Sequence, residues 1–84
     1  MNHISKLNKK LQKAGYNTEW TILPGSQIVT VRQGEKRLSA ENLFPGGLLG
    51  VSVVQPGVQP EFTGGLTADE AFELMKKELG VSDD

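Results

Sequence analysis

The stretch Glu19–Gln33, EWTILPGSQIVTVRQ, predicts two β-strands joined by a tight turn. β-Branched and aromatic residues, which favour strands, lie on both sides of Pro24 and Gly25. Proline presets φ at the second position of a type II turn, and glycine accepts the positive φ that the third position requires. We therefore expect a β-hairpin, with the rest of the chain covering or extending it.

A helix is predicted on each side of this hairpin. Before it, apolar residues recur at helical steps of three and four, at Ile4, Leu7, Leu11 and Ala14. Near the C-terminus, Thr67 and Glu70 match a capping box, in which each side chain bonds the backbone N–H of the other residue. An amphipathic pattern then runs to Gly80, which is placed to end the helix.

The segment between the hairpin and the second helix is less regular. Lys36–Ser39 predicts a short third strand, and residues 48–54 form an apolar run that suits a buried strand. Residues 40–44 fit either an extension of the third strand or a single helical turn. Proline and glycine are frequent in residues 55–65, which we interpret as a long loop.

These elements predict one small α+β domain spanning residues 1–84, with a flexible tail at residues 80–84. The expected architecture is an antiparallel sheet of three to four strands with an N-terminal and a C-terminal helix. The order is α-β-β-β-α, and both helices are expected to pack on one face of the sheet. A chain of 84 residues supports only a small core.

The net charge of −1 hides an uneven distribution. Residues 1–40 carry seven Lys and Arg against two Glu, whereas residues 41–84 carry two Lys against eight Asp and Glu. The two halves either compensate each other or present a surface for an anionic partner. The chain has no cysteine and no apolar run near the ~20 residues that span a bilayer, so we expect a cytoplasmic protein without a membrane partner.

The residues that catalysis requires are scarce. His3 is the only histidine, and we interpret it as a surface residue at the start of the first helix. Gly46–Gly50 does not match a phosphate-binding loop, and Asp69 and Glu70 are explained by the positive end of the helix dipole. The expectation is therefore a protein that is not an enzyme and that holds no cofactor or metal.

The predicted element order resembles the layout of double-stranded-RNA-binding domains and of the small toxin ribonucleases that share it. Gly15-Tyr16 after the first helix and Gly25-Ser26 in the hairpin turn carry this resemblance. Gln27 stands where such a toxin would carry its catalytic histidine, and it cannot transfer a proton in that way. Acidic residues also open the second helix, where the RNA-binding domains carry basic ones. The resemblance therefore implies the fold alone.

Two functional hypotheses follow. The first is a small regulatory module of accessory, adaptor or inhibitor type that acts through protein–protein contacts. Its contact residues would be Val58, Gln59 and Phe62, and its partner another protein or a second copy paired through a free sheet edge. The alternative for Val58 and Phe62 is that both side chains complete the core.

The alternative hypothesis is a nucleic-acid-binding protein that uses the basic N-terminal half. The residues concerned are Lys6, Lys9, Lys10, Lys13, Arg32, Lys36 and Arg37. It requires the first helix and the turn after the hairpin to share one surface.

Overall fold

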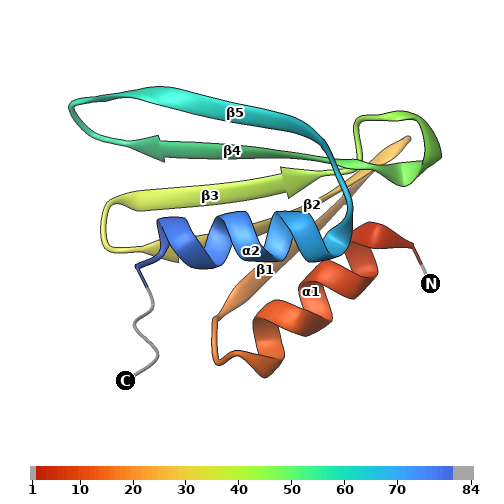
Figure 1. The fold of residues 1–84 in the computed structure, drawn as a ribbon, viewed down its shortest axis with the longest axis horizontal. Coiled ribbons are helices and arrows are strands. Elements are labelled where there is room, and N and C mark those ends of the chain that lie inside the picture. Colours follow the sequence, from red (N-terminus) through yellow and green to blue (C-terminus); the bar gives the residue numbers. More distant parts are fainter. Residues whose placement is uncertain (1, 81–84) are drawn as a thin grey trace.

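The computed structural model describes residues 2–80 and shows an α+β fold in which a helix, five antiparallel strands and a second helix follow one another (Figure 1). The sheet order is β1-β2-β3-β4-β5, so each strand pairs with its neighbour in sequence. The elements are α1 (His3–Lys13), β1 (Thr18–Leu23), β2 (Ser26–Gln33), β3 (Lys36–Glu41), the 3₁₀ turn η1 (Pro45–Gly47), β4 (Leu49–Gln55), β5 (Val58–Leu66) and α2 (Ala68–Glu78).

The predicted hairpin is confirmed as β1 and β2. The two strands pair from Thr18 opposite Val31 to Leu23 opposite Ser26. Gly25 has φ +82°, a conformation that glycine adopts without steric cost. β3 runs to Glu41, so residues 40 and 41 extend the third strand rather than starting a helical turn.

The prediction of three to four strands is wrong, because residues 55–65 are not a long loop. They contain the end of β4, a tight turn at Pro56-Gly57 and most of β5. Pro60 and the glycines at positions 64 and 65 concealed this strand, because such residues are depleted from strand interiors. β5 tolerates them because it is an edge strand with bulges in its pairing to β4.

Both helices contribute to one buried cluster with the sheet, and Figure 1 shows them against the same side of it. The cluster takes residues from α1, from the three strands β2 to β4 and from α2 with its C-cap. Within each strand these residues alternate along the sequence, so they lie on one face of the sheet. Its members are Ile4, Leu7, Leu11, Val29, Val31, Leu38, Ala40, Leu49, Val51, Val53, Ala68, Ala71, Met75 and Leu79.

The opposite side of the sheet carries neither helix, and we call it the open face. Side chains that alternate with the apolar residues of the cluster form a row across this face, in the order Thr30, Ser39, Ser52 and Phe62 from β2 to β5. The predicted tail begins at Gly80, and residues 81–84 lie outside the described part of the chain.

Candidate interaction surface

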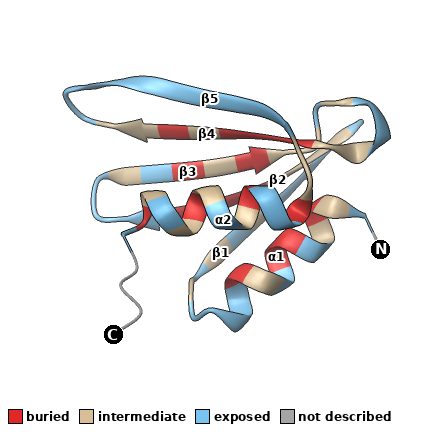
Figure 2. Cartoon of the chain, viewed as in Figure 1, coloured by how far each residue is buried: buried red, intermediate tan, exposed pale blue. Residues whose placement is uncertain are grey.

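The predicted protein-contact residues lie on β5, at the edge of the sheet. Val58 is 51% exposed and Phe62 is 56% exposed, and Gln59 is exposed as well. Figure 2 shows that this exposure extends along nearly the whole strand. Neither apolar side chain belongs to the buried cluster, so the core is built without them.

A β-bulge places these residues on different sides of the sheet. Val53 pairs with Glu61 and Gln55 pairs with Val58, so β5 has one residue more than β4 between the two pairs. The extra residue reverses the alternation of side chains. Val58 therefore lies on the helix side, where a depression of about 70 Å³ is lined by Val53, Gln55, Val58, Gln59, Glu61 and Glu78.

Phe62 lies on the open face and packs beside Phe44, which precedes η1. The two ring centroids are 6.3 Å apart and the ring planes are inclined by 30°. A Cβ at Gly50 would come within 2.6 Å of Phe62 Cζ, and one at Gly64 would collide with the Phe44 ring. The rings therefore lie directly on glycine backbone, as strand glycines permit. We call Phe44 and Phe62 the aromatic pair.

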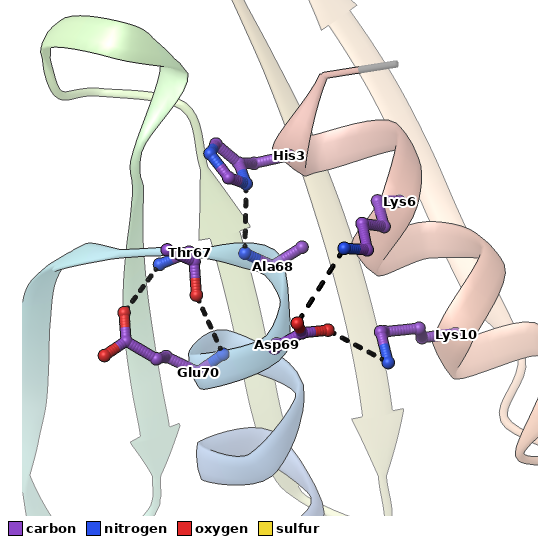
Figure 3. Close-up of polar contacts among 7 residues, drawn as sticks. All are labelled: His3, Lys6, Lys10, Thr67, Ala68, Asp69 and Glu70. Atoms are coloured by element: carbon purple, nitrogen blue, oxygen red, sulfur yellow. Dashed lines mark hydrogen bonds and ion pairs between the residues drawn. The ribbon is translucent and has the colours of Figure 1, made fainter.

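The basic residues of α1 meet an acidic residue of α2 (Figure 3). Lys10 Nζ lies 3.0 Å from Asp69 Oδ1, and Lys6 Nζ lies 3.8 Å from Asp69 Oδ2. The hydrogen bond and charge of Lys10, followed by the charge of Lys6, hold the pKa of the Asp69 carboxyl below its usual value. Two of the predicted nucleic-acid-binding lysines are thus engaged within the protein.

His3 and the capping box lie at the same contact between α1 and α2, which we call the helix junction. His3 Nδ1 accepts a hydrogen bond of 3.2 Å from the Ala68 backbone N–H, which links the first turns of both helices (Figure 3). The Glu70 N–H donates to Thr67 Oγ1 and the Thr67 N–H donates to Glu70 Oε1, as the sequence predicted. His3 is half-buried, because its Nδ1 is bonded to the start of α2.

The remaining basic residues lie on two sides of the sheet. Lys36, on the helix side, donates a hydrogen bond to the Glu78 carbonyl oxygen. Arg32 and Arg37 face each other across β2 and β3 on the open face, and Arg32 Nε donates to Glu19 Oε2 at 3.0 Å. The structure therefore does not bring the helix lysines and the two arginines onto one surface.

The described residues were also compared with the geometry that a metal site requires. Among residues 2–80 no group of three or more His, Asp or Glu is placed to hold a metal ion. The single histidine is engaged at the helix junction. No helix in the described part of the chain is long and apolar enough to cross a membrane.

Comparison with protein-family models, with curated proteins and with solved structures finds no match for this chain.

Sequence reasoning did not find the aromatic pair. The sequence places Phe44 at the end of the third strand or in a helical turn, Gly50 within a predicted strand and Gly64 in a predicted loop, and nothing in their spacing indicates that they meet. The two glycines are the sequence signal for this contact, because a glycine within a strand often marks a place where another group approaches the backbone closely.

Proposed function

We propose that this protein is a non-enzymatic binding module that contacts another protein through β5. The observation that carries the proposal is the exposure of β5: eight of its nine residues are exposed, including Val58 and Phe62. An unpaired strand edge offers backbone donors and acceptors to an incoming strand, and exposed apolar side chains beside it add specificity.

The rest of the molecule suits this role. The two helices and strands β2 to β4 supply the buried core, against which Leu66 at the end of β5 also packs, whereas Val58 and Phe62 are not part of it. The aromatic pair extends the contact surface from the edge onto the open face. A partner strand along β5 would reach Phe62 on one side and Val58 on the other, because the bulge separates them.

The test compares two serine variants of exposed apolar residues. Phe62→Ser should abolish capture of the partner from an extract of the source cells, and it should cost only about 1 kcal/mol of unfolding free energy because Phe62 is half-exposed. Ile22→Ser is the matched control, since Ile22 is 71% exposed but lies on β1. It should leave capture unchanged.

Two results would count against the proposal. A loss of about 3 kcal/mol or more in Phe62→Ser would assign Phe62 to the core instead. Salt-sensitive binding of labelled RNA or DNA, abolished by Lys9→Glu with Lys13→Glu in a folded protein, would favour the nucleic-acid alternative.

A further inference from the structure

β5 lacks a neighbour on one side within residues 2–80, since it ends the sheet order. Figure 2 shows the strand exposed along its length, and in Figure 1 the helices lie beside the other strands. Such an edge pairs readily with another strand unless charge, proline or a bulge prevents it. Pro60 and the bulges restrict the usable part of β5 to the residues around Phe62.

We propose that the partner strand at β5 is β5 of a second copy of this chain, antiparallel and in a register centred on Phe62. This inference rests on the proposed function, because it names the partner of the same surface. A two-fold axis through the centre of the pairing would make the contact isologous, so that it closes at a dimer. Pairing of β5 with β1 of another copy would instead leave an edge free at each end and continue without closing.

The side chains of β5 favour this register. With Phe62 at the centre, Glu61 lies opposite Thr63 of the second copy, and Pro60 lies opposite Gly64. No like charges then face each other, whereas a register centred on Glu61 would set two carboxylates directly opposite, which destabilises a strand pair.

The aromatic pair supplies the apolar part of this contact. Phe62 of each copy would lie beside the other on the open face, and each already packs against its own Phe44. The two aromatic pairs would form one continuous row of four rings. Aromatic residues that lie opposite each other on adjacent strands stabilise the pairing of those strands.

The contact is small, because it consists of one strand and one aromatic row from each copy. Interfaces below about 1,200 Å² are typical of weak or transient complexes. We therefore expect a dimer that dissociates on dilution, and light scattering after size exclusion should show its mass rising with protein concentration. Phe62→Ser should raise the dissociation constant about tenfold or more, since it removes the central contact.

Cross-linking tests the register, because the chain has no cysteine of its own. The variants Glu61→Cys and Thr63→Cys are prepared separately, one of them isotopically heavy, then mixed and oxidised mildly. The mixed disulfide should form about tenfold or more faster than either self-disulfide, because directly opposed residues lie closer than diagonal ones. β1 provides a matched control pair, Glu19→Cys with Thr21→Cys, which occupies the same spacing on the other edge strand and should show no preference.

The outcomes separate this inference from the proposed function. A monomer at every concentration, or equal rates for mixed and self-disulfides, would overturn the dimer. In that case the proposed function would still stand if the wild type captured a different protein and Phe62→Ser did not. Loss of neither dimer nor partner in Phe62→Ser would overturn both.

Discussion

The two edge strands, β1 and β5, share a short sequence pattern, but the aromatic residue in it packs against the core in β1 and is exposed in β5. β1 contains Glu19-Trp20-Thr21 and β5 contains Glu61-Phe62-Thr63, so each has an aromatic residue between a glutamate and a threonine. Trp20 lies opposite Val29 and packs against the buried cluster. Phe62 lies opposite Ser52 and is 56% exposed.

The strand register decides this difference. A shift of one residue in pairing moves every side chain of a strand to the other face. The register of β1 turns its aromatic ring toward the helices, and that of β5 turns its ring away from them. One aromatic residue therefore serves stability, and the other is left available for contact.

The largest expected effect is a difference in stability between the two aromatic positions. Trp20→Ala should lower the free energy of unfolding by about 2–4 kcal/mol, since it leaves a cavity beside the core. Phe62→Ala should lower it by about 1 kcal/mol, because that ring is more than half exposed. Urea unfolding followed by circular dichroism measures both, and equal losses would remove the distinction between the edges.

A smaller effect should come from the glycine beneath the aromatic pair. Gly64→Ala should destabilise by about 1–2 kcal/mol, because its Cβ would collide with the Phe44 ring and force it to move. In a Phe44→Ala background the same change should be close to neutral. A double-mutant cycle gives the coupling free energy. A value near zero would show that the ring does not rest on Gly64.

The smallest effect concerns the helix junction, which has no counterpart at β5. The pKa of Asp69 is lowered from 3.8 in the folded protein, mainly by Lys10. A carboxyl with a depressed folded pKa stabilises the fold above its unfolded pKa, and this contribution disappears as pH falls through the folded pKa.

The wild type should therefore exceed Asp69→Asn in stability at neutral pH, and the difference should vanish well below pH 3.8. Thermal melts across this range measure it, and added salt should reduce it because the Asp69 side chain is 63% exposed. A difference that persists in acid would mean that the Asp69 charge is not its cause.

Local signals in the sequence predicted the regular elements well. The hairpin is encoded by its turn residues and by strand formers on both sides. The second helix begins at a capping box whose two hydrogen bonds involve residues three positions apart. Such features depend on neighbours in the chain, so they are visible without a structure.

β5 was not predicted, because some of its residues favour a strand and others disfavour one. Pro60 and Gly64 argue against a strand, yet the edge position leaves room for both. Its strand character comes from pairing with β4, and the bulges in that pairing cannot be located from spacing alone.

By itself, the sequence determined the two amphipathic helices, the first hairpin, and the absence of cysteine chemistry. These depend on residue types and short spacings. Only the tertiary structure decided that Lys10 meets Asp69, that Arg37 lies away from the helix lysines, and that Phe62 is exposed. Each of these follows from strand register or helix packing, which bring together residues far apart in the chain. Register and helix packing cannot be recognised from short stretches of sequence.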